Sequence, residues 1–368
     1  MENLVNNCFN GVFSGKKVLL TGHNGFKGSW LTLWLSQLGA KVYGISLAPD
    51  TEPSHWQLLN LPLPSEQDNL LDISQFVDVK RIIDAVQPEL VLHLAAQPLV
   101  RQSYHTPLTN WHTNVMGTVH VLEACRQQPS VKAILAVTTD KVYENPESGR
   151  PFNEDSPLGG HDPYSASKAA CELVVQSYRR SFFSTPQAPL LATARAGNVI
   201  GGGDWAADRL IPDIVRASQS GRPVKLRYPL AVRPWQHVLD CLSGYLLLAA
   251  GMLQGNSALA CSWNFGPPEA DNQSVADVLQ LMQQHWPLLK WETESHPQHW
   301  HEAGLLRLST EKARTALQWQ PVWDVEQAAA MTALWYQRFY QHNEILSQAQ
   351  LTEYIRCARD KGLRWAIN

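Results

Sequence analysis

The amino-acid sequence predicts an α/β fold, a doubly wound parallel sheet with a smaller, discontinuous C-terminal substrate lobe. Three observations predict this fold. Short apolar runs alternate with helical patterns through the first half of the chain, which is typical of a parallel sheet covered on both faces. A glycine-rich turn directly follows the first apolar run, and beyond Asn198 the regular alternation gives way to a region punctuated by Gly and Pro.

The predicted strands are short apolar runs bounded by turn signals or helical patterns. We expect strands at residues 17–21, 41–45, 90–94, 133–138, 190–195 and 261–265. Helices are expected in the gaps between them. This alternation predicts helices on both faces of one sheet.

The region after Asn198 predicts a second lobe built from several segments. It opens with residues 201–204, and the strand pattern returns only briefly before the C-terminal tail. We therefore expect one domain from residues 1–198 together with roughly 235–266, and a second lobe from residues 199–234 and 267–368. Ligands of doubly wound folds bind outside the carboxyl ends of the strands, so this lobe would close over a substrate.

Composition and charge exclude several classes of protein. Hydrophobic residues make up 44% of the chain and charged residues 17%, which is typical of a globular protein. The formal net charge of -3 is too balanced for a nucleic-acid partner. The six cysteines are scattered, which favours reduced thiols and a cytoplasmic location. We expect neither secretion nor a membrane anchor, because no signal-peptide pattern or long apolar run is present.

A dinucleotide site is predicted in the turn at residues 21–28, between the first strand and a helical pattern. The first two glycines permit a tight turn and close approach to a pyrophosphate, the third permits helix–strand packing, and the helix N-terminus offers free N–H groups. A chance glycine turn is the alternative. The G-x-x-G-x-x-G spacing resembles the Rossmann-type turn of the extended short-chain dehydrogenase/reductase family. The expected cofactor contacts are Gly22, Asn24, Gly25, Phe26 and Gly28.

The cofactor is expected to be NAD. Residues 46–50, after the second strand, place no acidic residue at the strand end for the adenosine ribose, and no Arg for the 2′-phosphate of NADP. Asp72 and Ile73 resemble the pair that lies beside the adenine in the extended family. Helix capping is the alternative role for Asp72.

Tyr164 and Lys168 form a Tyr-x-x-x-Lys pair, which a helix would place on one face. The neighbouring ammonium, assisted by an oxidised nicotinamide, would stabilise a tyrosinate. Tyr164 could then take a proton from a sugar hydroxyl near neutral pH. An exposed Tyr–Lys pair would be the structural alternative, but the glycine turn upstream favours redox chemistry.

The triplet Thr139-Asp140-Lys141 follows a predicted strand, at the end where doubly wound enzymes place chemistry. Thr139 could hydrogen-bond the hydroxyl being oxidised. Asp140 could protonate a hydroxide leaving group, and Lys141 is a candidate for removing a proton from carbon. A solvated Asp–Lys ion pair is the alternative.

These motifs together resemble the nucleotide-sugar 4,6-dehydratases over nearly the whole chain, and most closely their CDP-glucose branch. The triplet departs from the dTDP- and GDP-sugar branches, which have a carboxylate where Lys141 stands. That departure leaves two roles for Lys141, as the C5 base or as a group that orients Asp140 or a water. By the resemblance, Ala95, Ala96 and Gln97 lie along the cofactor, and the substrate is held by Asn198, Arg209, Arg233, His301 and Arg307.

His296, His299 and His301 are close in sequence but do not predict a metal site. Pro and Trp interrupt the spacing, and neither a cysteine nor a carboxylate pair joins them. The inferred redox chemistry needs no metal. Contact with the nucleotide is the role that the resemblance implies for this stretch.

The resemblance implies conversion of CDP-glucose to CDP-4-dehydro-6-deoxyglucose, on the way to deoxysugars of bacterial surface polysaccharides such as O-antigen. It also implies a homodimer or a higher homo-oligomer. Two alternatives remain. A nucleotide-sugar 4-epimerase shares Tyr164 and Lys168 but has no need of Asp140 and Lys141. A dinucleotide-sensing regulator without turnover would usually have a broken Tyr-x-x-x-Lys pair, and here the pair is intact.

Overall fold

The computed structural model describes residues 5, 7–61, 63–268, 271–293 and 305–367. Its centre is a seven-stranded sheet in which every pairing is parallel. In spatial order the strands are β11 (Ser262–Phe265), β6 (Leu190–Ala196), β5 (Ala133–Val137), β4 (Leu90–His93), β1 (Lys17–Thr21), β2 (Lys41–Ser46) and β3 (Asp68–Leu70). The strand order reverses direction between β1 and β4, which opens a crevice at their carboxyl ends.

This sheet confirms the predicted doubly wound α/β fold, and all six predicted strands belong to it. The seventh strand, β3, was missed. Its sequence Asp-Asn-Leu has no β-branched residue. It is extended because it pairs with β2, and because the Asn69 side chain donates to the carbonyl of Gly44 at 3.1 Å.

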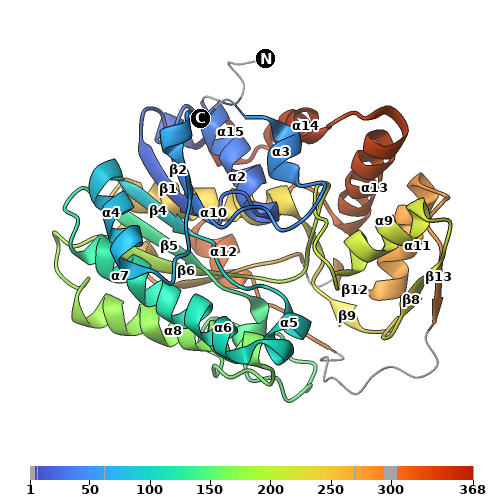
Figure 1. Ribbon diagram of the computed structural model, residues 1–368, viewed down its shortest axis with the longest axis horizontal. Coiled ribbons are helices and arrows are strands. Elements are labelled where there is room, and N and C mark those ends of the chain that lie inside the picture. Colours follow the sequence, from blue (N-terminus) through green and yellow to red (C-terminus); the bar gives the residue numbers. More distant parts are fainter. Residues whose placement is uncertain (1–4, 6, 62, 269–270, 294–304, 368) are drawn as a thin grey trace.

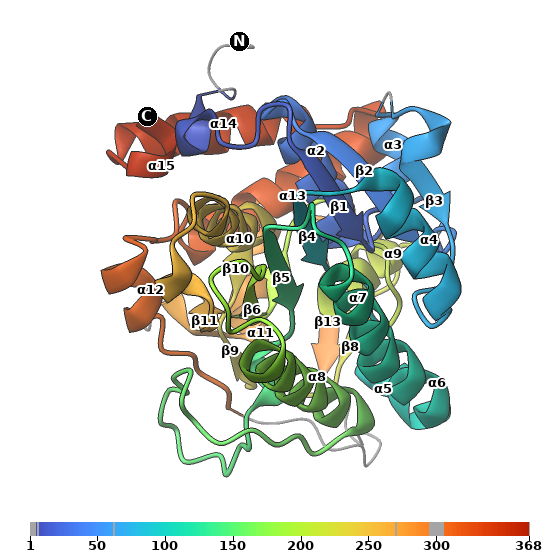
Figure 2. The same cartoon turned by 90° about the vertical axis from the view of Figure 1, so that its left-hand side faces the viewer.

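Helices cover the two faces of the sheet (Figures 1 and 2). One face carries α2 (Phe26–Gln37) and α10 (Val238–Leu253), and the other carries α4 (Phe76–Val86), α7 (Gly117–Arg126) and α8 (Pro163–Ser181). Alternate residues of β1 separate accordingly, with Val18 and Leu20 in the first core and Leu19 in the second. The period of two in a strand therefore divides one sheet between two hydrophobic cores.

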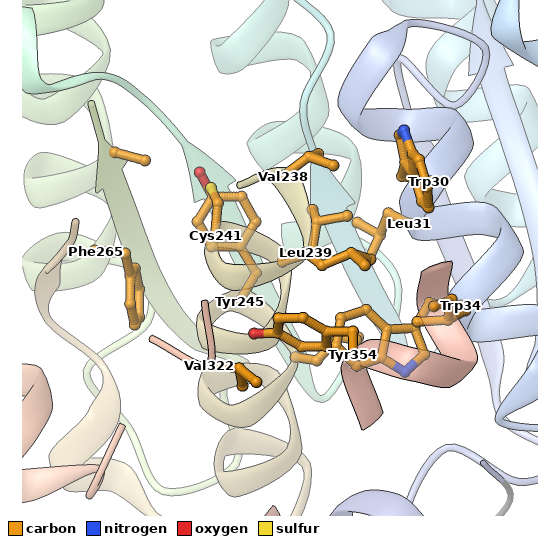
Figure 3. Close-up of a cluster of buried hydrophobic side chains, with 14 of the residues drawn as sticks. Trp30, Leu31, Trp34, Val238, Leu239, Cys241, Tyr245, Phe265, Val322 and Tyr354 are labelled. Carbon is orange, nitrogen blue, oxygen red and sulfur yellow. The ribbon is translucent and has the colours of Figure 1, made fainter. Parts of the chain in front are cut away.

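The larger core lies between α2, α10 and the C-terminal helices. Figure 3 shows Leu31 and Trp34 of α2 beside Leu239 of α10 and Tyr354 of the C-terminal region. The Trp34 and Tyr354 rings meet edge to face at 5.7 Å. The last helices therefore cover α2, the helix that follows the glycine turn.

The rest of the chain forms short strand pairs and peripheral helices. The short strands are β7 (Val199–Ile200), β8 (Val224–Leu226), β9 (Val232–Arg233), β10 (Gln236–His237), β12 (Gln273–Ser274) and β13 (Trp291–Thr293). The remaining helices include α3 (His55–Leu59), α5 (Val100–His105), α6 (Pro107–Trp111), α9 (Leu210–Gln219), α11 (Val275–His285), α12 (Glu311–Ala316), α13 (Val325–His342), α14 (Ser347–Asp360) and α15 (Arg364–Ile367). Single-turn elements are η1 (Cys8–Gly11), η2 (Ser65–Gln67), η3 (His112–Met116), η4 (Asp140–Val142) and η5 (Ser257–Leu259).

The division into two lobes stays a prediction. Among the short pairs, β8 joins β13 and β9 joins β12, apart from the main sheet. Of the C-terminal helices, α13 contacts α11, whereas α14 contacts α2 and α15 contacts η1. A search of the described residues finds no helix that is both long and apolar enough to cross a membrane.

Candidate active site

A cavity of about 850 Å³ opens at the carboxyl ends of the central strands. Its walls come from the glycine turn after β1, the segment after β4, the triplet after β5, the start of α8, the loop from Gly201 to Arg209 and the start of α9. The cavity therefore occupies the crevice at which the strand order reverses.

The glycine turn has the shape that a dinucleotide needs. Gly22 has a positive φ of +75°, and a Cβ on it would lie 2.8 Å from the backbone nitrogen of Ala95. A Cβ on Gly28 would lie 1.9 Å from the carbonyl oxygen of Gly22. The residue before α2 is Gly25, and no side chain caps this helix end. The first N–H groups of α2 can therefore bind an anion such as a pyrophosphate.

The other predicted cofactor residues lie around this turn. Asn24, Phe26, Asp72, Ile73, Ala95 and Ala96 all line the cavity. The Asn24 side chain donates to the carbonyl of Leu47 at 2.6 Å and so fixes the segment after β2. Asp72 accepts from the backbone N–H of Ser74 at 2.8 Å. It therefore stabilises a turn and also lines the cavity.

Gln97 does not line the cavity. Its backbone N–H donates to Asn114 Oδ1 at 2.7 Å, and its carbonyl accepts from Asn114 Nδ2 at 3.2 Å. Asn114 lies in η3, a π-helical turn, and also donates to Ser167 of α8 at 2.9 Å. Gln97 thus fixes the segment after β4 against α8.

His93 ends β4 beneath the cavity. Its Nδ1 lies 2.7 Å from Thr21 Oγ1 and its Nε2 lies 3.0 Å from Thr118 Oγ1. Burial, and to a smaller extent the charge of Lys168, lowers the pKa of His93 to about 3. His93 is therefore a neutral hydrogen-bonding link between β1, β4 and α7.

Tyr164 and Lys168 both line the cavity from α8. Asp162 caps this helix and accepts from Ser165 N at 2.9 Å. Burial raises the pKa of Tyr164 to about 12, while a hydrogen bond with Thr139 and the charge of Arg209 oppose the rise.

Lys168 is buried in the protein interior and donates to the carbonyl of Val137 at 2.9 Å. Burial lowers the pKa of Lys168, and the nearby acidic groups Cys171 and Glu172 oppose that shift. The hydrogen bond fixes α8 at the end of β5, next to the triplet.

The triplet lies beside Tyr164, which has a side-chain hydrogen bond with Thr139. Thr139 caps the η4 turn, and its hydroxyl donates to Asp140 Oδ1 at 3.0 Å. Asp140 is buried, and its Oδ2 has no hydrogen-bond partner among the described residues. Burial raises the pKa of Asp140 against the opposing charges of Lys141, Arg233 and Lys27. The structure therefore holds a carboxyl whose pKa is raised by burial beside the predicted base.

Three of the predicted substrate residues line the same cavity, namely Asn198, Arg209 and Arg233. Arg209 donates to Asp204 Oδ2 at 2.8 Å. Arg307 is not among the lining residues, and its carbonyl accepts from Phe152 N at 2.9 Å. His301, like His296 and His299, lies outside the described residues.

Sequence reasoning missed two kinds of lining residue. Lys27 lines the cavity and could have been found, because it lies inside the glycine turn. Arg101 and Asp208 also line it and form an ion pair of 2.8 Å. No local signal could have found this pair, since 107 positions separate its members.

Comparisons with known proteins show the family of the chain. The family described as GDP-mannose 4,6 dehydratase matches residues 19–332. The chain is 41% identical over 352 residues to a CDP-glucose 4,6-dehydratase of Salmonella typhimurium, covering 93% of this chain and 97% of the relative.

Solved structures of lower identity share the fold. The UDP-glucose 4-epimerase of Thermus thermophilus, in complex with NAD, superposes with a TM-score of 0.74 at 24% identity, covering 87% of this chain and 99% of that one. The dTDP-glucose 4,6-dehydratase of Bacillus anthracis, also in complex with NAD, gives 0.72 at 22% identity, covering 88% and 97%. The family match and the Salmonella relative show that this chain belongs to the family described as GDP-mannose 4,6 dehydratase, the nucleotide-sugar 4,6-dehydratases.

Proposed function

We propose that the chain converts CDP-glucose to CDP-4-dehydro-6-deoxyglucose, with NAD as its cofactor. The named relative from Salmonella supports the substrate, and Lys141 in the triplet matches the CDP-glucose branch that the sequence resembles. The product would enter the synthesis of deoxysugars for surface polysaccharides such as O-antigen.

The residues of the glycine turn fit NAD. The α2 N-terminus would hold the pyrophosphate, because the glycines leave room for it and no side chain caps the helix. Ile73 and Asp72 would lie beside the adenine, and Ala95 and Ala96 along the cofactor. Bound NAD would accept the hydride from C4 of the sugar and return it to C6.

Tyr164 is the base for the first step. It takes the proton of the C4 hydroxyl as the hydride leaves, and Thr139 hydrogen-bonds the same hydroxyl. Since burial raises the pKa of Tyr164 to about 12, the tyrosinate needs the Lys168 ammonium and the positive nicotinamide nearby. The resulting C4 ketone acidifies the C5 proton.

Asp140 then acts as the acid of the elimination. It donates a proton to the C6 hydroxyl, which leaves as water when the C5 proton is removed and a 4-keto-5,6-ene forms. The Lys141 amine has no hydrogen bond or ion pair within the part of the chain that the structure describes. It can serve either as the C5 base or as the group that orients Asp140 or a water.

The observation that carries this proposal is the buried Asp140 carboxyl, with its unpaired Oδ2, in one cavity with Tyr164. Oxidation alone, as in a 4-epimerase, does not require this carboxyl. Protonation of a leaving hydroxide requires a carboxylic acid that stays protonated near neutral pH, and burial favours that form.

The surroundings suit the same function. Arg233 and Arg209 offer planar guanidinium groups for the diphosphate of the substrate. All six cysteines are free thiols, which supports a reducing, cytoplasmic compartment. The exposed apolar residues of α6 and α8 support a homodimer, since Leu108 is 85% exposed and Leu173 57%.

The test is incubation of the protein with CDP-, dTDP-, UDP- and GDP-glucose, with products followed by NMR. A C6 methyl group beside a C4 ketone, formed fastest from CDP-glucose, is the expected result. A galactose configuration would instead make the chain an epimerase. No turnover of any substrate, with NAD still bound, would point to a sensor and contradict the proposal.

A further inference from the structure

A buried ion pair lies behind the triplet. Arg195 of β6 and Glu172 of α8 are 3% and 2% exposed. Arg195 Nε donates to Glu172 Oε1 at 2.9 Å, and Arg195 Nη2 donates to Oε2 at 2.8 Å. Burying two charges costs free energy that their pairing must offset, so such a pair is weak evidence for a purely stabilising role.

Two residues that flank the triplet are bonded to this pair. Thr138, directly before the triplet, donates its hydroxyl to Glu172 Oε1 at 2.5 Å. Tyr143, two residues after it, accepts from Arg195 Nη1 at 2.8 Å and donates to Asn264 of β11 at 2.6 Å. The segment that carries Asp140 is therefore held on both sides by one bidentate pair.

The same pair fixes the triplet relative to α8. Glu172 follows Lys168 by one helical turn and Tyr164 by two, so all three side chains lie on one face of the helix. At one end of that face Tyr164 lines the cavity. At the other end Glu172 forms hydrogen bonds at the ends of β5 and β6. Figure 2 shows α8 alongside β5 and β6, whose ends carry these contacts.

We propose that Glu172 and Arg195 are positioning residues that set the placement of Thr139-Asp140-Lys141 relative to Tyr164. This role rests on the proposed function, because the placement matters only if one site both oxidises C4 and eliminates water. Catalysis is sensitive to such placement, since a shift of about 1 Å can cost roughly 100-fold in rate.

The pair also acts on Lys168 through charge. The groups that face Lys168 are Glu172 and Cys171 on its own helix, Lys27 of α2, and His93 of β4. The pKa of His93, lowered to about 3, leaves it neutral. The negative charge of Glu172 favours the ammonium form, so its removal should lower the pKa of Lys168 further.

The first experiment compares Glu172→Gln with a matched control, Glu89→Gln. Glu89 pairs with Lys16 at 2.7 Å before β4 and β1, at the amino ends of the strands. For Glu172→Gln we expect kcat per folded protein to fall about 10- to 100-fold with KM within about twofold of wild type. The high-pH limb of kcat should move to lower pH. Glu89→Gln should change neither quantity.

The second experiment separates positioning from stability. The double variant Glu172→Leu/Arg195→Met removes both charges, and it should unfold at a higher temperature than Glu172→Gln, which leaves the Arg195 charge buried without its partner. We expect its kcat to stay low. If kcat recovers together with stability, the pair is structural only and the proposal is wrong.

A third set of variants leaves the ion pair intact and cuts its bonds to the two residues that flank the triplet. Thr138→Val with Tyr143→Phe removes only two hydroxyls, and we expect kcat to fall at least about fivefold without loss of folding. Wild-type kcat in this variant would also overturn the proposal. If the wild-type chain forms no C6 methyl product, the proposed function is wrong. This outcome is distinguishable from failure of the positioning role, which leaves the wild-type activity unchanged.

Discussion

At the scale of single residues, the chemistry depends on two equally buried acids whose partners differ. Burial raises the pKa of Asp140, whose Oδ2 has no partner among the described residues. Glu172 is equally buried, yet hydrogen bonds and charge from Arg195 lower its pKa despite that burial. The pairing decides the role, so one carboxyl is available as an acid and the other is a fixed anion.

Asp140→Asn tests the acid directly. An amide cannot donate the proton that the leaving hydroxide needs, so we expect formation of the C6 methyl product to fall roughly 100- to 1000-fold. Formation of reduced nicotinamide in a single turnover, read by absorbance, should stay within about threefold of wild type. An equal loss of both signals would show that Asp140 is not the elimination acid.

Asp240 predicts a pH dependence of stability. It lies in α10, and its Oδ1 accepts from Tyr354 of α14 at 2.7 Å and from Val322 N at 2.6 Å. Burial raises the pKa of Asp240 to about 7, and these hydrogen bonds oppose the rise. The folded chain thus holds a proton that the unfolded chain releases near its ordinary pKa of about 4.

Because the folded pKa is the higher one, the stabilisation from Asp240 is complete at pH below about 4 and is lost as pH rises through about 7. Between pH 5.5 and 8 we expect the free energy of unfolding to lose roughly 2 kcal/mol on this account, an order-of-magnitude figure. Urea titrations of wild type and Asp240→Asn at both pH values measure it. The variant should lack that loss, and identical pH profiles would rule out this role for Asp240.

At the scale of elements, the glycine turn shows that identical residues can be required for different reasons. Gly28 is required by the fold, because its Cβ would meet the Gly22 carbonyl oxygen at 1.9 Å. A Cβ on Gly25 would lie at an ordinary 3.5 Å from the same oxygen. Only a ligand at the helix end would exclude a side chain there.

Gly25→Ala and Gly28→Ala should therefore behave differently. We expect Gly25→Ala to melt within about 2 °C of wild type, while its affinity for NAD falls about tenfold, which is about 1.4 kcal/mol. Gly28→Ala should lose stability as well as affinity. Calorimetry and tryptophan-fluorescence titration with NAD measure both. Unchanged NAD affinity in Gly25→Ala would place the pyrophosphate elsewhere.

The sequence could predict the elements whose own residues determine them. The six apolar strands were found, and so were the glycine turn and the triplet at the end of β5. Strand β3 and the short strands β8, β9 and β13 have two or three residues each, too few for a period to show. Their pairing partners impose the extended backbone, so the local sequence carries little signal.

The same distinction holds for the site. Tyr164 and Lys168 were predictable because a helical offset of four places them together. Glu172 and Arg195 meet because β6 lies beside α8, and the ion pair of Arg101 with Asp208 joins the segment after β4 to the loop after β7. Tertiary structure brings these groups together, so a single sequence without an alignment does not reveal them.

At the scale of the whole molecule, one surface stands out by its apolar side chains. Leu108 and Trp111 of α6, Met116 of η3 and Leu173 of α8 are exposed, and these three elements contact one another. Such a surface on a globular chain is typical of an interface. In the proposed homodimer, a second copy of the chain covers this surface.

Leu173→Glu should convert that dimer to a monomer, since it would place a charge in an apolar contact without a partner. Sedimentation equilibrium at micromolar concentration measures the mass. Val77→Glu is the matched control, because Val77 is 79% exposed on α4, outside this surface, and should leave the dimer intact. A monomeric wild type would contradict the dimer itself.

The covering of α2 by α14 has a consequence for synthesis on the ribosome. Helix α2 is buried from Gly28 through Leu35, and Trp34 packs on Tyr354 of α14 and Trp365 of α15. These partners emerge more than 300 residues later. During most of translation, the apolar side of α2 that α14 and α15 cover is therefore exposed. This exposed surface favours binding of a chaperone to the growing chain.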